Sequence, residues 1–171
     1  DRSRFDLGRL LLDVGVRLIQ VREPELAPAQ RDALAREIVE LATPYRARVL
    51  LNGSAEDAHR LGCAGVHWTA QTLLKATARP RDLVVGASCH TRADIAHAGA
   101  LDVDFAVMGP VLATPTHPDA HPIGWDGFAA AIAGTRVPVF ALGGMHASDL
   151  EIAIAHGAHG VAMRRHAWPD L

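Results

Sequence analysis

The sequence of 171 residues is poor in the features that point to several large classes of protein. Lys75 is the only lysine among 17 basic residues, and the formal net charge is -2. The chain therefore lacks the basic surface with which proteins bind nucleic acid or anionic membranes. No apolar run approaches the length of a membrane span, and the polar start from Asp1 to Arg4 is not a signal peptide. We expect a cytoplasmic protein with no nucleic-acid or membrane partner.

Cysteine is scarce as well. Cys63 and Cys89 form no Cys-x-x-Cys pair, so two thiols in a reducing compartment are expected rather than a disulfide. Ten histidines are present, yet pairs such as His156 and His159 lack the helical spacing and neighbouring carboxylate typical of a zinc site. The sequence therefore predicts no metal and no cofactor.

Short apolar runs alternate with helical patterns along the chain, which indicates one domain with a parallel sheet and helices outside it. The predicted strands are 16–21, 48–51, 65–67, 83–87, 105–108, 137–142 and 160–163. The predicted helices are 28–43, 54–61, 69–77, 91–98, 126–133 and 146–156.

Two folds share this alternation, a doubly wound sheet and a closed barrel. A doubly wound nucleotide fold needs a glycine-rich turn after its first strand, whereas here the first strand ends in Gln20-Val21-Arg22-Glu23-Pro24. Polar residues also come just after nearly every strand, where a barrel gathers them at one mouth. We therefore predict an α/β fold, a (β/α)₈ TIM barrel, as a single domain over residues 1–171. Since seven strands are recognisable, we expect the first strand upstream of Asp1 and a last helix cut short after Trp168, as in a fragment of a longer chain.

Two glycine-containing turns predict a phosphate site. The strand 137–142 ends at Gly143 and Gly144, where the main chain can approach an anion closely. A tight turn without a ligand is the alternative. A second glycine-rich unit, 157–163, ends at two arginines, and neighbouring strand ends carrying Gly and Arg favour the anion site. The predicted phosphate-binding residues are Gly143, Gly144, Met163, Arg164 and Arg165.

A histidine follows another predicted strand, in Ser88-Cys89-His90-Thr91. At a barrel mouth, His90 could act as a general acid or base because the pKa of histidine normally lies near neutrality. The alternative is a helix cap at Ser88 or Thr91 beside a solvated His90. Because adjacent strand residues point to opposite faces, Cys89 is not expected to pair with His90 as a nucleophile.

Further polar residues are candidate substrate ligands. Gln20 and Arg22 are two apart on one strand, so they share a face, where an arginine needs Glu23 or an anionic ligand as partner. The loop threonines could donate to a phosphate or belong to a rigid surface loop, and His67 could line the pocket or pack in the core. The substrate-binding candidates are Gln20, Arg22, Asn52, His67, Ser88, Thr114 and Thr116.

Taken together, these residues resemble the thiamine phosphate synthase/TenI (thiazole tautomerase) superfamily over almost the whole chain. The matching segments are Gly15 to Arg22, Leu51-Asn52, Gly65-Val66-His67, Ser88-Cys89-His90, Gly109-Pro110 with Thr114-Pro115-Thr116, and the two glycine turns. The resemblance implies a TIM barrel of thiamine metabolism that binds a small phosphorylated heterocycle, a thiazole or pyrimidine. If the domain is an enzyme, the resemblance makes His90 its catalytic acid–base.

Four positions depart from the synthase pattern of that family. Where synthases carry two lysines and two magnesium-binding aspartates, this chain has Pro24, His117, Gly53 and Thr72. A diphosphate leaving group needs its charge neutralised by metal or lysine. The resemblance therefore points to a metal-independent thiazole tautomerase rather than to a synthase.

Three segments, Val66-His67-Trp68-Thr69, Ala87-Ser88-Cys89-His90 and Gly160 to Arg165, also resemble the C-terminal barrel fused to Nudix hydrolases of the MutT type. That likeness implies a covalently fused Nudix domain upstream of Asp1. It also implies an alternative function, a non-catalytic ligand-binding or regulatory module of a Nudix (8-oxo-dGTP diphosphatase-type) hydrolase. Turnover and the formation of an oligomer are left open by the sequence.

Overall fold

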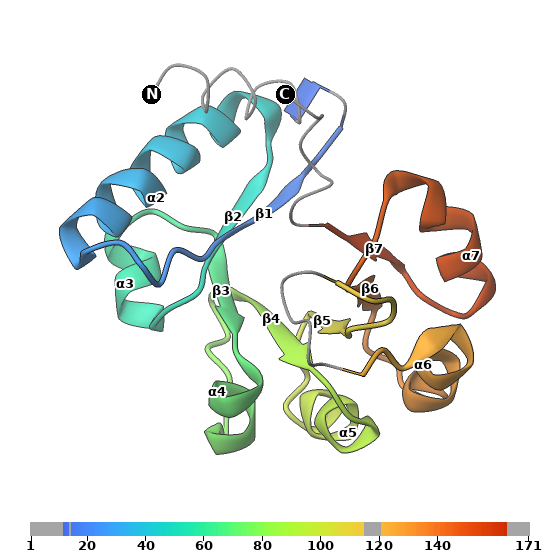
Figure 1. The fold of residues 1–171 in the computed structure, drawn as a ribbon. Coiled ribbons are helices and arrows are strands. Elements are labelled where there is room, and N and C mark those ends of the chain that lie inside the picture. The colour runs from blue at the N-terminus through green and yellow to red at the C-terminus, as the bar shows by residue number, and fades with distance from the viewer. Residues whose placement is uncertain (1–11, 14, 115–120, 164–171) are drawn as a thin grey trace. The chain divides into compact units, whose positions relative to one another are not determined.

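Strands and helices alternate throughout the computed structural model, which describes residues 12–13, 15–114 and 121–163 (Figure 1). The strands are β1 (Leu18–Val21), β2 (Arg48–Leu51), β3 (Gly65–Trp68), β4 (Val84–Cys89), β5 (Phe105–Met108), β6 (Val139–Leu142) and β7 (Gly160–Ala162). The helices are α2 (Pro28–Ala42), α3 (Ala55–Arg60), α4 (Ala70–Lys75), α5 (Arg92–Ala100), α6 (Gly124–Ile132) and α7 (Leu150–Ala155), with 3-10 turns η1 (Thr43–Tyr45) and η2 (Ala147–Asp149). No helix in these ranges is both long and apolar enough to cross a bilayer.

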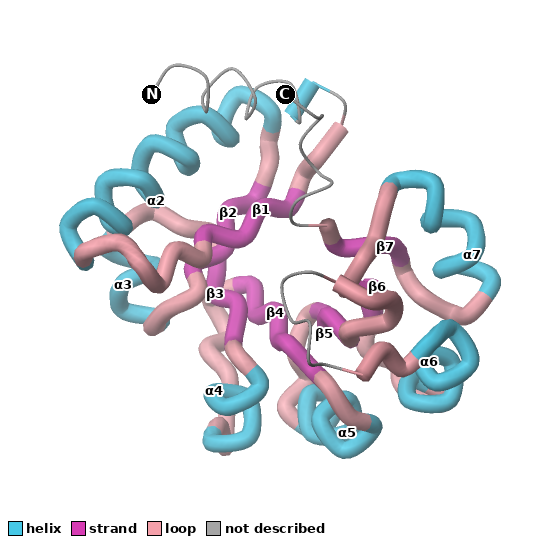
Figure 2. The backbone as a smooth tube through the Cα atoms, viewed as in Figure 1, coloured by secondary structure: helices cyan, strands magenta, loops and turns pink. Residues whose placement is uncertain are grey.

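The seven strands form one sheet in the order β1-β2-β3-β4-β5-β6-β7, and the tube in Figure 2 follows their alternation with helices. The pairs with a defined register are parallel; Leu18 pairs with Arg48 in β1–β2 and Val107 with Phe140 in β5–β6. Strictly sequential order means that every crossover advances the sheet in the same direction. A doubly wound sheet would reverse direction at a switch point, so the order favours the TIM-type alternative.

The chain divides into two compact units. Unit 1 comprises Asp1–His67 and Pro80–Val85, and unit 2 comprises Trp68–Arg79 and Gly86–Leu171. In unit 2, α5, α6 and α7 lie outside the strands (Figure 1). Phe105–Met108 are all buried, as expected for a parallel strand covered on both faces. Phe128 of α6 is fully buried in this unit as well.

Each predicted strand and helix has a counterpart in the structure, and most of them differ from the prediction at their ends. Strands 48–51 and 105–108 have the predicted bounds, whereas β4 continues past the predicted Ala87 to Cys89 because Ser88 and Cys89 pair with Val107 and Met108. The helix predicted over 146–156 is instead η2 followed by α7. His90 therefore comes directly after a strand of six residues.

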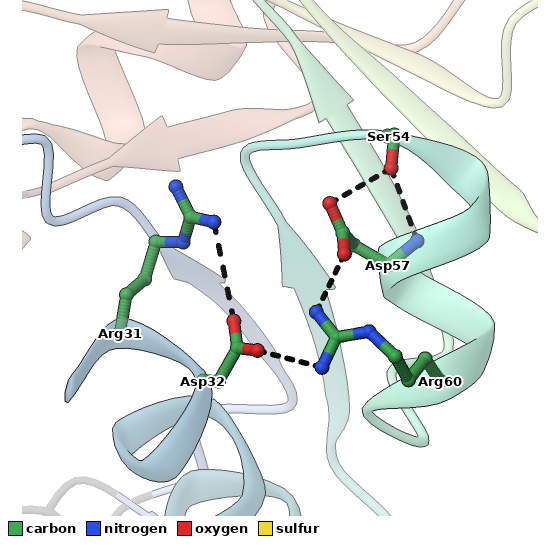
Figure 3. A network of polar contacts seen from close by, with 5 residues as sticks. All are labelled: Arg31, Asp32, Ser54, Asp57 and Arg60. Atoms are coloured by element: carbon green, nitrogen blue, oxygen red, sulfur yellow. Dashed lines mark hydrogen bonds and ion pairs between the residues drawn. The ribbon is translucent and has the colours of Figure 1, made fainter. Parts of the chain in front are cut away.

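A network of arginines and carboxylates connects α2 with α3 in unit 1 (Figure 3). Arg60 donates to Asp32 at 2.6 Å and to Asp57 at 2.5 Å, and Arg31 lies 3.9 Å from Asp32. Ser54 caps α3 by accepting the backbone N–H of Asp57 at 3.0 Å. The hydrogen bonds from Arg60 hold the pKa of both carboxyls below the ordinary value of 3.8.

We predict that Arg60→Gln destabilises the protein at neutral pH and that the difference from wild type shrinks in acid. The stabilisation is complete above pH 3.8, the ordinary carboxyl pKa, and disappears as the pH falls through the lower folded-state pKa values of Asp32 and Asp57. Urea unfolding between pH 7 and pH 2 measures this. Arg36→Gln, an exposed change on the same helix, is the control and should show no such pH dependence. A deficit of Arg60→Gln that stays constant with pH would contradict the assignment.

Candidate functional site

In unit 1, Asn52 ties together the carboxyl ends of three strands. Its backbone N–H donates to the carbonyl of Val21 at 2.9 Å, and its side-chain Nδ2 donates to the carbonyl of His67 at 3.0 Å. The side-chain amide of Asn52, which was predicted to bind substrate, therefore also connects neighbouring strands. Its Oδ1 accepts no hydrogen bond from the described part of the chain and is the atom that could meet a ligand.

His67 belongs to the core of unit 1. The residue is 4% exposed, and burial, together with the positive charge of Arg22, lowers its pKa from 6.5 to about 4. His67 is therefore neutral at physiological pH. Arg22 and Gln20 are both exposed, with Val21 buried between them. The structure thus places Arg22 and His67 close enough to interact electrostatically.

We predict that His67 reduces stability in mild acid. Its folded-state pKa of about 4 lies below the ordinary 6.5, so the unfolded chain binds the extra proton first and stability falls as the pH drops from 6.5 towards 4. A shift of this size corresponds to roughly 3 kcal/mol below that window. An NMR titration should show the His67 ring neutral down to about pH 4. A midpoint near 6.5 would overturn this prediction.

In unit 2, the ring of His90 is held at the end of β4. Its Nδ1 lies 2.7 Å from the carbonyl oxygen of Gly109. A carbonyl oxygen only accepts, so Nδ1 carries the proton, and Nε2 of the neutral ring has a free lone pair. No described residue bonds to Nε2, and the residue is exposed. The arrangement suits a general base that takes a proton through Nε2.

A buried carboxylate that sequence analysis missed lies behind His90. Asp94, 6% exposed, accepts the backbone N–H groups of His90 at 2.8 Å and Thr91 at 2.9 Å through the same oxygen, Oδ2. Thr91 Oγ1 in turn accepts the N–H of Asp94 at 3.1 Å. This is a capping box at the start of α5. The spacing of Thr91 and Asp94 was the signal that could have identified it.

Cys89 is an inert thiol in this arrangement. The side chain is fully buried, and burial, followed by the nearby charge of Asp94, raises its pKa to about 12. A thiolate nucleophile is therefore not available at neutral pH. Ser88, next to it in β4, is half-buried and pairs with Val107.

The Gly143–Gly144 turn packs against the loop that follows β5. Both glycines have positive φ, 99° and 66°. Leu112 donates its N–H to the carbonyl of Gly143 at 3.1 Å. A Cβ on Gly143 would lie 2.6 Å from Cα of Pro110, and one on Gly144 would lie 2.5 Å from the carbonyl oxygen of Ala113. The tight-turn interpretation therefore has a physical basis of its own, and the phosphate site at this turn stays a prediction.

Of the remaining predicted ligands, two belong to the described residues and three do not. Thr114, at the end of that loop, and Met163, just after β7, are both half-buried. Thr116, Arg164 and Arg165 lie outside the described residues.

We predict that Gly144→Ala destabilises the protein more than Gly134→Ala. Gly134 also has positive φ, 81°, but a Cβ there meets nothing within 4 Å. Gly134→Ala should therefore cost only the left-handed backbone penalty of about 1–2 kcal/mol. Gly144→Ala must in addition displace Ala113. Urea unfolding of both variants measures the two free energies of unfolding. Equal losses of stability would contradict the prediction, because the loop containing Ala113 would then move aside without cost.

The residues present do not fit the magnesium site that the synthase resemblance implies. Gly53 follows Asn52 and offers no carboxylate. The hydroxyl of Thr72 lies 3.0 Å from Thr69 Oγ1, in the cap of α4. The described ranges contain no cluster of three or more His, Cys, Asp or Glu side chains that could bind a metal ion. Hard cations such as Mg²⁺ bind oxygen ligands, chiefly carboxylates, and neither Gly53 nor Thr72 supplies a carboxylate.

The sequentially ordered parallel sheet, with polar residues after its strands, defines an α/β protein of the TIM-barrel type. The sequence matches the family model TMP-TENI, described as thiamine monophosphate synthase, over residues 2–167. The chain therefore belongs to this family, which confirms the predicted resemblance to the thiamine phosphate synthase/TenI superfamily. The sheet order and this match together confirm the predicted TIM-type fold class, whereas the fusion to a Nudix domain stays a prediction.

Known relatives agree with this assignment. A Geobacter sulfurreducens protein is 37% identical over 153 residues, which are 87% of this chain and 72% of that protein. The thiamine-phosphate synthase of Albidiferax ferrireducens is 31% identical over 167 residues, covering 91% and 76% of the two chains. The solved thiamine phosphate pyrophosphorylase from Pyrococcus furiosus superimposes with a TM-score of 0.77 at 22% identity, over 95% of this chain and 81% of that one. This last likeness concerns the fold.

Proposed function

We propose that the chain binds a phosphorylated thiazole or pyrimidine in thiamine biosynthesis and acts on a thiazole as a metal-independent tautomerase. The observation that carries the proposal is the hydrogen bond between His90 Nδ1 and the Gly109 carbonyl, 2.7 Å long. This bond fixes the tautomer of His90 and leaves Nε2 as the basic atom. Membership of the family supplies the class of ligand.

Tautomerisation can be catalysed by a single group that removes a proton from one atom of the substrate and returns it to another. Nε2 of neutral His90 would remove a proton from one carbon of the bound heterocycle, and the resulting imidazolium would return it to another atom. Charge and atoms are conserved, and no leaving group departs. Throughout the cycle Nδ1–H keeps its bond to the Gly109 carbonyl, which stabilises the imidazolium and prevents rotation of the ring.

Synthase chemistry is less well supported, although relatives carry that name. Release of diphosphate develops negative charge that cations must neutralise. Gly53, Thr72 and Pro24 occupy the positions at which synthases carry two aspartates and a lysine, and Lys75 is the only lysine in the chain. Proton transfer by His90 needs none of these cations.

The proposal assigns the phosphate ester to Gly143, Gly144, Met163, Arg164 and Arg165. The positive φ of both glycines is compatible with backbone N–H groups that face an anion. Thr114 and Thr116 would bind a second anionic group. The assignment of Gln20, Arg22 and Asn52 to the ring or carboxylate, and of His67 and Ser88 to the same ligand, rests on the sequence pattern.

Binding without turnover is the second candidate. The loss of four synthase positions favours it as well, since a module that recognises a phosphorylated heterocycle needs no diphosphate chemistry. Such a module would suit a chain fused to a Nudix hydrolase domain. The two candidates differ in one measurable respect, the interconversion of a bound thiazole.

We predict that His90→Asn lowers the tautomerase rate on a thiazole phosphate carboxylate by about 10²-fold or more, the usual effect of removing a positioned acid–base. Binding of thiazole phosphate, measured by calorimetry, should change little, because the phosphate contacts lie elsewhere. His146→Asn, an exposed histidine that precedes η2, is the matched control. Wild-type protein that binds the thiazole without converting it would favour the binding module, and His90 would then be a recognition residue.

A further inference from the structure

We infer that Asp94 is the positioning residue for proton transfer: it fixes the backbone of His90 so that the imidazole meets Gly109 through Nδ1 and keeps Nε2 for the ligand. The inference deepens the proposed function and rests on it in one respect, since it takes His90 as the acid–base. Its structural content, the control of the His90 tautomer by Asp94, can be tested without any turnover.

The hydrogen bonds of Asp94 exceed what a helix cap requires. A capping box needs the side chain of the fourth residue to accept only the N–H of the cap residue, here Thr91. Asp94 Oδ2 also accepts the N–H of His90, at 2.8 Å against 2.9 Å for Thr91. Because Asp94 is 6% exposed, both charge-assisted bonds are shielded from water and therefore strong.

The imidazole is consequently fixed at two points. The backbone of His90 is held by α5 through Asp94, and its ring is held by the end of β5 through the Gly109 carbonyl at 2.7 Å. Gly109 is held in place by its N–H, which donates to Cys89 O at 3.3 Å, and it lies so close to Leu142 that an added Cβ would be 2.2 Å from the Leu142 carbonyl oxygen. With both ends fixed, the side-chain rotamer of His90 and the proton on Nδ1 are determined together.

Removal of the Asp94 carboxylate should abolish the bond that holds the backbone of His90 to α5. The segment 90–91 would then lose its anchor to α5, and the ring could turn away from Gly109. A His90 ring in solvent exchanges between its two tautomers, so a fraction of the molecules would carry the proton on Nε2, where it blocks the base. Misplacement of a catalytic group by about 1 Å can lower a rate by roughly 10²-fold.

The experiment compares Asp94→Ala, Asp94→Asn and Thr91→Ala. The amide oxygen of Asp94→Asn can accept both N–H groups, so this variant should recover the geometry. Thr91→Ala removes the other half of the same cap, the bond from Asp94 N to Thr91 Oγ1, while both bonds to Asp94 Oδ2 remain. It is the matched control for loss of helix stability. Asp94→Ser, with a shorter acceptor, replaces Asp94→Ala if the latter does not fold.

Two readouts are measured on folded protein. The first is the ¹⁵N signature of the His90 ring, which distinguishes Nδ1–H from Nε2–H and does not depend on activity. The second is the kcat and KM for conversion of a thiazole phosphate carboxylate. We expect Asp94→Ala to mix the tautomers and to lower kcat about 10- to 100-fold with KM within about twofold of wild type. Thr91→Ala should leave the tautomer as in wild type, and Asp94→Asn should restore most of the kcat.

The outcomes separate this inference from the proposed function. If wild-type protein has no tautomerase activity, the proposed function fails, and the ring signature alone decides the role of Asp94. If Asp94→Ala keeps the Nδ1–H tautomer, the inference is overturned whatever the activity. Equal loss of kcat in Asp94→Ala and Thr91→Ala would also overturn it, because the effect would then follow helix stability rather than the bond to His90.

Discussion

The main chain of Gly109 passes so close to the carbonyl oxygen of Leu142 that no Cβ fits between them. This contact determines how the ends of β5 and β6 approach each other in unit 2. Beyond it the loop and turn are joined by the bonds Val111 N to Leu142 O at 2.8 Å and Leu112 N to Gly143 O at 3.1 Å. On one side of this contact the Gly109 carbonyl accepts from His90 Nδ1, and on the other side Gly143 and Gly144, which follow Leu142, have positive φ. The acid–base candidate and the phosphate candidate depend on the same close approach.

Lysine is scarce in this chain, and arginine side chains make the contacts that connect several of its helices and loops. Arg60 bridges two carboxylates of α2 and α3, Arg92 donates to the carbonyls of Ala130 and Ala133 near the end of α6, and Arg79 reaches the Asp102 carbonyl and Asp104. Arg60 and Arg92 each use both terminal nitrogens of the planar guanidinium fork, whereas Arg79 donates to its two acceptors through Nη1 alone. The arginines described in this way hold helices and loops together. The scarcity of lysine therefore does not weaken the scaffold.

Much of the fold could be predicted because hydrophobic periodicity is a local signal. The strand at 105–108 is a continuous apolar run, the strand at 48–51 is apolar after its first residue, Arg48, and the ends of both were predicted correctly. Strand β4 was predicted too short because Ser88 and Cys89 continue it only through their pairing with Val107 and Met108, which are distant in sequence. Family membership was recognisable for another reason, the order of several short motifs along the whole chain.

The candidate site was less accessible to sequence reasoning because its chemistry depends on burial and on partners. His67 could line a pocket or pack, and only its 4% exposure settles that it is a neutral core residue. His90 was identified from its place after a strand, but the backbone carbonyl that sets its tautomer carries no sequence signature. Asp94 was overlooked because a Thr-x-x-Asp pattern normally indicates a helix cap and nothing more.

One carboxylate can serve the scaffold and the site together because α5 begins two residues after His90. A bond that starts the helix necessarily anchors the residue that presents the imidazole, and the low exposure of Asp94 keeps that anchor rigid. The same charge contributes to the raised pKa of Cys89, so the thiol beside His90 stays protonated and unreactive. The local fold thus leaves the Cys89 thiol buried and protonated next to the exposed ring of His90, whose Nδ1 is bonded to the Gly109 carbonyl. This difference between two neighbouring side chains follows from burial and hydrogen bonding around β4 and α5.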